Sequence, residues 1–386
     1  MDGLSHETRT ALVLSGGGAR AAYQAGVLRG LVDLGVAPSG RSGFEVLVGA
    51  SAGAINAGML AATADRFDEG VNGLEHVWGT ITAEHVFRTD LRSLGEIGFR
   101  WMRDLSFGGL LRHTSPKSLL DTAPLRDLLA AHISFDHIGA NVACGALRAL
   151  AVLATNLYTA DGVVFVQGLP DIALWQRGRW SIERARIGVD HLMASGAIPI
   201  FFPTVEIEGR HFGDGSVRNT APLSVAINLG VERIVAIGVS HGHPPETPGS
   251  VRHAGPPSVA QVAASLLDAV LLDAIQVDVE HSARVNRGVV AVGGDAGAQP
   301  FRRIEVLWLA PSRSIGAIAA EHVDGIPAVV RFLMRGLGGD ESTIELASYL
   351  LFDATFCTRL MELGRADVAA RAGEIRAFFA GRAHTA

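Results

Sequence analysis

The fold can be argued from one segment, Thr10–Arg20, whose sequence is TALVLSGGGAR. Its first six residues, Thr10–Ser15, form a short apolar run that ends at three consecutive glycines, which predicts a buried strand leading into a tight turn. Ala19–Leu34 carries apolar residues at helical spacing and stops at Gly35, as a helix that ends at a glycine does. A strand, a turn and a helix in this order predict the first unit of a parallel α/β sheet.

The same order of elements continues downstream. Phe44–Val48 predicts a second buried strand and Ala52–Ala62 a helix of small residues. Further strands are predicted at Ala149–Asn156, Gly162–Gln167, Arg233–Val239 and Arg303–Leu309, with a short hairpin around Gly209. Helices are predicted within Phe67–His132, at Ile182–Ala194, Pro222–Leu229 and Val259–Arg287, and from Ile318 to the end. We therefore predict an α/β domain over residues 10–312 and a C-terminal helical extension over residues 313–386.

Composition restricts the class of protein. Hydrophobic residues make up 48% and charged residues 19% of the 386, which is typical of a globular chain. The net charge of −6 argues against a standing affinity for nucleic acid or for an anionic bilayer. Cys144 and Cys357 provide no disulfide framework, and neither a signal peptide nor a membrane span is indicated. We expect a cytoplasmic protein.

A G-x-S-x-G pattern, formed by Gly49, Ser51 and Gly53, lies between a predicted strand and a predicted helix. A nucleophile on a sharp strand-to-helix turn needs glycine on both sides, because the backbone there is strained and closely packed. The turn also places the hydroxyl above a helix N-terminus, whose amides favour negative charge. We predict that Ser51 is a nucleophile. The alternative is a glycine-rich turn that holds a serine by chance.

The glycine loop, formed by Gly16, Gly17 and Gly18, leaves backbone amides free to converge on an anion. A dinucleotide-binding loop would need a glycine where this chain has Ala21, and the Gly-Lys-Ser/Thr of a phosphate-binding Walker loop is absent. An oxyanion hole fits best, because neighbouring parallel strands would bring this loop and Ser51 to the same edge of the sheet.

A serine nucleophile needs a group that accepts its proton. Asp214 lies in a predicted turn, where an aspartate is often only a turn former. The order of elements favours a catalytic role, because too few strands precede Ser51 for an α/β-hydrolase, whose triad ends in a histidine. His241 and its neighbours lie in a proline-rich loop, residues 240–257, which is a poor place to hold an imidazole accurately. We predict a Ser51–Asp214 dyad, with a histidine-containing triad as the alternative.

Together these features resemble the patatin-like phospholipase family. The resemblance rests on the GGGAR loop, on G-x-S-x-G, and on the aspartate motif Asp214-Gly215-Ser216, which the segment Ala194–Pro199 precedes. It covers about residues 10–240. Two positions depart from the family: Ala21 stands where a glycine is usual, and Ser216 where a glycine or alanine is usual. Serine is small, so we expect the turn to be kept.

The resemblance implies a patatin-like three-layer α/β/α fold with a mainly parallel central sheet. It implies that Ser51 is the nucleophile, that Asp214 is the general base, and that the amides of Gly16, Gly17 and Gly18 form the oxyanion hole. It also implies hydrolysis of phospholipids, lysophospholipids or other fatty-acyl esters, with no metal or organic cofactor.

The predicted insert after the serine helix contains the aromatic residues Phe87, Phe99, Trp101 and Phe107. These side chains could line an acyl pocket or a lid, or they could pack helices together. Arg20 could steady the glycine loop, meet an anionic head group, or lie at the surface. Substrate access is expected through transient contact with a membrane surface or from soluble esters. A non-catalytic lipid-binding regulator on the same fold is the alternative from another class of function.

Overall fold

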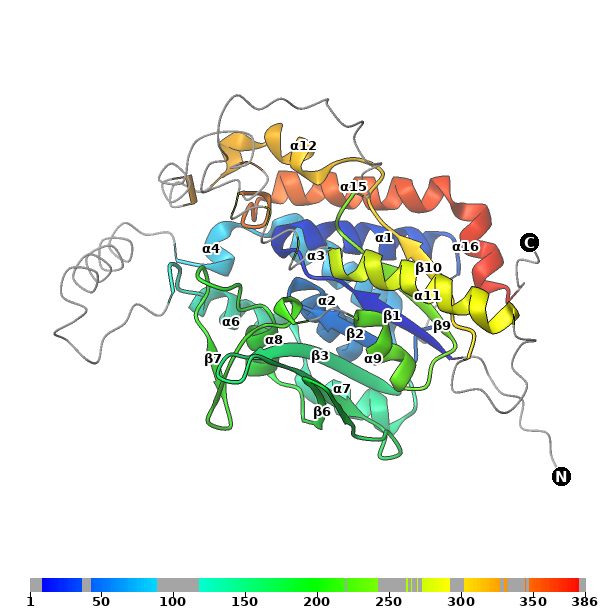
Figure 1. Ribbon diagram of the computed structural model, residues 1–386. Helices are drawn as coiled ribbons and strands as arrows, with labels where there is room; N and C mark the ends of the chain where they lie inside the picture. Colours follow the sequence, from blue (N-terminus) through cyan, green and yellow to red (C-terminus); the bar gives the residue numbers. More distant parts are fainter. Residues whose placement is uncertain are drawn as a thin grey trace.

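The computed structural model describes residues 9–36, 43–88, 118–218, 221–241, 273–291, 302–326 and 347–381, with a few isolated residues between them. Within these ranges the chain folds around one twisted sheet with helices on both faces (Figure 1). The predicted α/β class and its three layers are confirmed.

The sheet has the strand order β10-β9-β1-β2-β3-β4-β6-β5, and β8 pairs with both β3 and β7. The five strands from β10 to β3 run parallel, whereas β4 pairs antiparallel with β3. The strands are β1 Thr10–Leu14, β2 Val46–Ala50, β3 Ala149–Asn156, β4 Asp161–Gly168, β5 Gln176–Arg177, β6 Trp180–Arg184, β7 Val205–Ile207, β8 Arg210–Asp214, β9 Arg233–Ile237 and β10 Glu305–Leu309.

The central strands are apolar over most of their length because helices cover both faces. On β1, Leu12 and Leu14 point into one hydrophobic cluster, while Ala11 and Val13 point into a second cluster on the opposite face. Successive side chains of a strand alternate between faces. Polar side chains are therefore few on these strands and lie at their ends, as Thr10, Thr155 and Asn156 do, which explains the largely apolar runs in the sequence.

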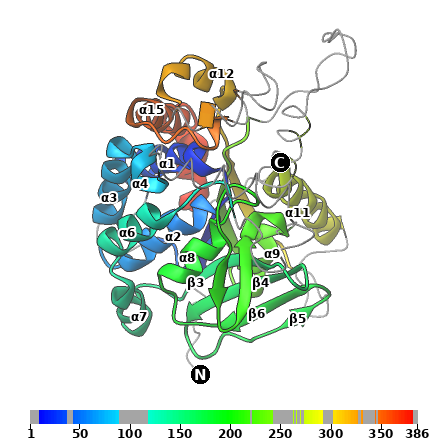
Figure 2. The same ribbon diagram turned by 90° about the vertical axis from the view of Figure 1, so that its left-hand side faces the viewer.

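The larger layer of helices packs on the face that holds Leu12 and Leu14, and the smaller layer packs on the other (Figure 2). The larger layer holds α1 Ala22–Asp33, α2 Ala52–Ala62, α3 Phe67–Thr80, α4 Ala83–Val86, α6 Ala123–His132, α7 Phe135–Ala143, α8 Val189–Ser195, α12 Ile315–Ala320, α15 Ala354–Ala370 and α16 Ala372–Phe379. The smaller layer holds α9 Pro222–Asn228 and α11 Asp273–Ala291. Short 3-10 helices lie at Gly18–Ala21, Gly215–Val217 and Val323–Gly325.

One prediction of secondary structure is wrong. Ile182–Ala194 was expected to be a single helix, but its first residues belong to β6, and α8 begins only at Val189. Trp180–Arg184 pairs in parallel with β4 and extends the sheet. The prediction failed because the helical spacing of apolar residues continues from β6 into α8, which are two separate elements.

The C-terminal helix α15 packs directly against α1 in the larger layer (Figure 1). A Cβ atom built on Gly26 of α1 would lie 2.0 Å from the carbonyl oxygen of Met361 on α15. The two helices therefore touch backbone to backbone. The boundary between residues 312 and 313 stays a prediction. Among the described helices, none is both long enough and apolar enough to cross a bilayer.

Candidate active site

Ser51 occupies the turn between β2 and α2 with φ 54° and ψ −131°. A positive φ is uncommon for any residue other than glycine and is seen where the surrounding structure imposes it. A Cβ atom at Gly53 would lie 2.4 Å from the carbonyl oxygen of Ser15, and one at Gly49 would lie 2.4 Å from that of Gly53. Both glycines of the pattern are thus required by close backbone packing, as the sequence predicted.

Asp214 is the last residue of β8 and is completely buried. Its amide donates to the carbonyl of Ala197 at 3.0 Å, and its own carbonyl accepts from the Thr155 hydroxyl at 2.8 Å. The carboxylate oxygen Oδ1 accepts a hydrogen bond from the amide of Ser216 at 2.8 Å. These contacts fix the backbone and one side of the carboxyl group.

The other carboxylate oxygen, Oδ2, has no hydrogen-bond partner among the described residues. Burial raises the pKa of Asp214 to about 6, although hydrogen bonding to Ser51 and to Ser216 acts to lower it. The Ser51 hydroxyl is thus near enough to influence the carboxyl group, without forming a hydrogen bond of ordinary length and angle. Such looseness is common in catalytic pairs when no substrate is bound. A buried carboxylate with an open acceptor oxygen can take up a proton.

The glycine loop lies between the two motifs. A Cβ atom at Gly16 would lie 3.0 Å from the Cβ of Ser51 and 2.4 Å from the Oγ of Ser216. Within the part of the chain that the structure describes, the amides of Gly16, Gly17 and Gly18 donate no backbone hydrogen bond, although all three residues are buried. Buried amides without partners are rare. Three of them beside a serine can stabilise a negatively charged oxygen.

Sheet topology explains why these groups meet. β1 and β2 are parallel neighbours, so the glycine loop and Ser51 both follow the carboxyl ends of adjacent strands. β8 pairs antiparallel with the carboxyl end of β3, where Asp214 lies opposite Ala154. The chain therefore brings Ser51, Asp214 and Gly16 to one edge of the sheet, as the sequence predicted.

The turn after α8 holds both Ser51 and Asp214, and sequence reasoning had given it no such role. The hydroxyl oxygen of Ser195 accepts the Ser51 amide at 3.0 Å. Two residues later, the carbonyl of Ala197 accepts the Asp214 amide. Ser195 is fully buried. One short turn thus sets the spacing between the hydroxyl and the carboxylate.

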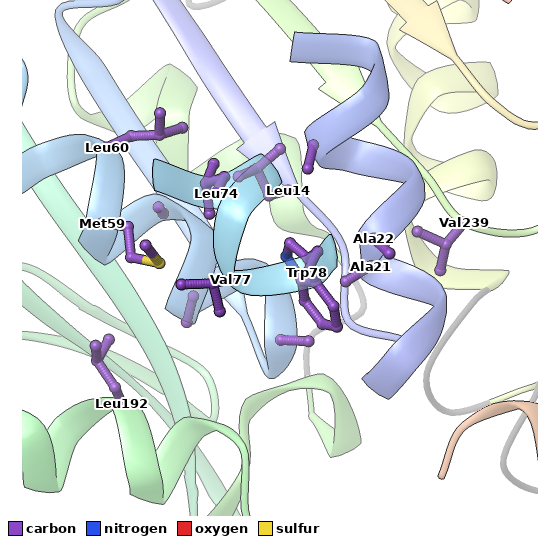
Figure 3. Packing of buried hydrophobic residues seen from close by; sticks show 14 of the residues in the cluster. Leu14, Ala21, Ala22, Met59, Leu60, Leu74, Val77, Trp78, Leu192 and Val239 are labelled. Carbon is purple, nitrogen blue, oxygen red and sulfur yellow. The ribbon is translucent and has the colours of Figure 1, made fainter. Parts of the chain in front are cut away.

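An apolar cavity opens beside Gly18 and Ala52 and encloses about 610 Å³ of empty space, part of it open to solvent. Its walls come from helices of the larger layer and from the C-terminal part of the chain, and they include Met59, Trp78, Leu125, Leu129, Ile198 and Phe352. Met59 of α2 and Val77 and Trp78 of α3 lie close together in this region (Figure 3). A cavity lined almost entirely by apolar side chains is suited to a hydrocarbon chain.

The remaining candidate residues are only partly covered by the structure. Phe87 is buried and packs against Phe202 and Phe352, so it belongs to the core. The other aromatic residues of the insert, Phe99, Trp101 and Phe107, lie outside the described residues. The imidazole of His241 contacts the carbonyl of Pro311 at 2.8 Å, and most of the loop at residues 240–257 lies outside the described ranges.

Arg20 is not a surface residue, because its exposed fraction is only 2%. Its Nε donates to the hydroxyl of Ser348 at 2.7 Å, and its guanidinium lies 4.0 Å from the ring centre of Tyr349. The carbonyl of Tyr349 accepts the amide of Ala19 at 3.0 Å. Of the roles considered for Arg20, the structure supports steadying the glycine loop.

One family model matches this chain, and two solved structures show a distant similarity to it. A family model described as Patatin-like phospholipase matches residues 12–227. Among solved structures, VipD from Legionella pneumophila is similar with a TM-score of 0.31 and 13% identity, over 79% of this chain and 61% of that chain. A chain of the complex of full-length SpcU with full-length ExoU from Pseudomonas aeruginosa is similar with a TM-score of 0.26 and 14% identity, over 89% and 70%. The chain thus spans about three fifths of the VipD chain. The comparison with curated proteins found no match.

Proposed function

Because the chain belongs to the patatin-like phospholipase family, we propose that it hydrolyses fatty-acyl esters with Ser51 as nucleophile and Asp214 as general base. One observation supports this most strongly. Gly16 adjoins both Ser51 and the aspartate motif, and the amides of its loop have no hydrogen-bond partner among the residues that the structure describes. A hydroxyl, an open carboxylate oxygen and anion-binding amides are the three groups that acyl transfer needs.

In the first half of the reaction, Asp214 Oδ2 accepts the proton of the Ser51 hydroxyl as Oγ bonds to the carbonyl carbon of the ester. The carbonyl oxygen takes the negative charge, which the amides of Gly16, Gly17 and Gly18 stabilise. Collapse of this intermediate breaks the bond to the alcohol, which leaves with the proton from Asp214.

In the second half, Asp214 takes a proton from water as the water oxygen attacks the acyl-serine. Collapse returns that proton to Ser51 Oγ and releases the fatty acid. A base whose pKa is near 6 is ionised at neutral pH and yet able to hold the proton briefly.

The cavity supports an acyl chain as the part of the substrate that binds. Its walls carry few polar groups. It begins beside Gly18, which belongs to the glycine loop, and beside Ala52, which follows Ser51. We propose phospholipids, lysophospholipids or other fatty-acyl esters as substrates, reached by a cytoplasmic protein through transient contact with a membrane surface.

The test compares Ser51→Ala and Asp214→Asn with the wild type on p-nitrophenyl acyl esters and on a phospholipid panel. We expect each variant to lose activity by at least about 10³-fold while keeping its circular dichroism spectrum. Ser224→Ala, on α9, and Asp136→Asn, at the surface, are matched controls that should keep full activity. Substantial hydrolysis by Ser51→Ala would contradict the proposal.

Two further measurements separate the alternatives. His241→Ala should keep its activity, and a loss as large as that of Ser51→Ala would indicate a histidine-containing triad instead. A fluorophosphonate probe should label the wild type at Ser51. A protein that binds lipid but neither turns over esters nor reacts with the probe would be a lipid-binding regulator.

A further inference from the structure

A chain of buried side chains connects the wall of the apolar cavity to the glycine loop. Trp78 Nε1 donates to Asn56 Oδ1 at 3.0 Å, and Asn56 Nδ2 donates to Gln24 Oε1 at 2.9 Å. Gln24 Nε2 then donates to the carbonyl oxygen of Ser15 at 2.9 Å. Gln24 and Asn56 are fully buried, and Trp78 is 5% exposed. We call these three residues the Trp78–Asn56–Gln24 chain.

The end of this chain at Ser15 acts on the first amide of the glycine loop. The carbonyl of Ser15 and the amide of Gly16 belong to one planar trans peptide, in which the C=O and N–H bonds point in opposite directions. The hydrogen bond from Gln24 to the carbonyl therefore fixes the direction of the Gly16 N–H. The hydroxyl of Ser15 in turn donates to the carbonyl of Gly16 at 3.1 Å and holds the next peptide.

The other end of the chain borders the space proposed for the acyl chain. Trp78 and Asn56 are both part of the cavity wall. The indole ring of Trp78 lies 6.5 Å from the ring of Phe352 and is nearly parallel to it. Phe352 therefore also packs against the indole of Trp78. An acyl chain that reaches Trp78 would press on a residue hydrogen-bonded, through two amides, to the peptide that presents the Gly16 N–H.

We propose that Gln24 is a positioning residue for the oxyanion hole and that Asn56 and Trp78 couple its orientation to the filling of the cavity. This inference rests on the proposed function. Its consequence is that turnover, and not only binding, depends on acyl-chain length. Esters long enough to reach Trp78 pack against the donor end of the Trp78–Asn56–Gln24 chain and add to its support of the Gly16 amide, whereas shorter esters leave that end of the chain without this contact.

The decisive variants are Gln24→Met, which removes the amide with little change of shape, and Trp78→Phe, which removes the Nε1 donor together with part of the ring and keeps an aromatic wall. The concentration of active sites is first counted with a fluorophosphonate probe, so that misfolded protein does not lower kcat. We expect Gln24→Met to lower kcat by about 10- to 100-fold on long-chain esters with little change in KM. We expect Trp78→Phe to flatten the dependence of kcat on chain length.

A matched control is Asn141→Leu. Asn141 is 4% exposed and donates to the carbonyl of Ala61, away from the glycine loop. This variant should lose stability to a similar degree while its kcat per active site is unchanged. A kcat per site within about twofold of wild type in Gln24→Met, or an equal fall of kcat in Asn141→Leu, would overturn the inference.

Hydrogen–deuterium exchange supplies a readout that does not depend on turnover. Amides in the peptide covering residues 15–21 should exchange faster in Gln24→Met than in Asn141→Leu. If residues 15–21 exchange at the same rate in the two variants, Gln24 does not position the glycine loop, whether or not the protein hydrolyses esters. If exchange changes as expected but Ser51→Ala still hydrolyses esters, the proposed function fails and the structural role of Gln24 stands.

Discussion

At the scale of single residues, the role proposed for Asp214 as general base predicts how the reaction should respond to pH. Its pKa is raised to about 6 by burial, and only the ionised carboxylate can accept the serine proton. We expect kcat/KM to rise with pH through about 6 and to stay level above it. A pH–rate profile on a short soluble ester measures this. If kcat/KM instead rises around another pH, and this rise is lost in the His241→Ala variant, the general base would be His241.

The same shift makes a prediction about stability. In the unfolded chain an aspartate titrates near about 3.9, so between that pH and about 6 the folded protein binds more protons than the unfolded one. The free energy of unfolding therefore falls as pH rises through this window. Asp214→Asn carries no charge and should be more stable than wild type at neutral pH, by up to a few kcal/mol. Urea unfolding at several pH values tests this: a stability gap that does not shrink below about pH 4 would contradict it.

The residues of the proposed site differ in how well sequence alone could find them. Ser51 and the glycines stand in local patterns whose spacing reflects backbone packing, and Asp214 stands in a turn. Gln24 and Asn56 are polar residues with apolar neighbours in their helices, and nothing near them in the sequence shows that they touch. Their pairing depends on how α1 and α2 cross, which only the folded structure shows.

At the scale of elements, the contact between α1 and α15 leaves no room for side chains. A Cβ atom at Gly364 would lie 2.5 Å from the carbonyl oxygen of Tyr23. Gly364→Ala should lower the free energy of unfolding by about 1–3 kcal/mol, as overpacking does. Gly288→Ala, on α11 with no atom within 4 Å, should raise it by roughly 0.5–1 kcal/mol. Denaturant unfolding of both variants compares the effects, and equal shifts would argue against close packing of the two helices.

Elements with a clear pattern were predicted well, and those with an ambiguous pattern were not. The strands of the central sheet show continuous apolar runs because both of their faces are buried. β6, Trp180–Arg184, is only partly buried and lies next to the short edge strand β5. Its few apolar residues fit a helical spacing as well as an alternating one. The spacing of apolar residues alone therefore could not show that β6 is a strand distinct from α8.

At the scale of the whole molecule, the structure joins segments more than three hundred positions apart. The glycine loop is held by Arg20 against Ser348 and Tyr349, although the family model ends at residue 227. Arg20→Ala should increase hydrogen exchange in residues 347–353 as well as in the loop itself. Arg66→Ala, which removes exposed ion pairs with Asp65 and Glu69, should leave both segments unchanged. Increased exchange in the loop alone would show that the two segments are held independently.

Sequence alone could not predict that long-range contact. The segment before α15 carries no motif. It contributes the Ser348 hydroxyl, the Tyr349 ring and the Tyr349 carbonyl, and nothing near these residues in the sequence shows that they contact the glycine loop. The C-terminal extension was predicted to be helical, which α15 and α16 bear out. Its contact with the glycine loop follows only from the position of α15 over α1.

The backbone of Ser51 adopts a conformation that is costly for a residue with a side chain. A side chain at a positive φ of 54° is disfavoured by about 1–3 kcal/mol, and glycine would adopt that angle freely. Ser51→Gly should therefore melt at a higher temperature than Ser51→Ala, which keeps the Cβ atom, while both are inactive. The glycine variant would then have the higher melting temperature, and the side chain proposed as the nucleophile would be the source of the backbone strain.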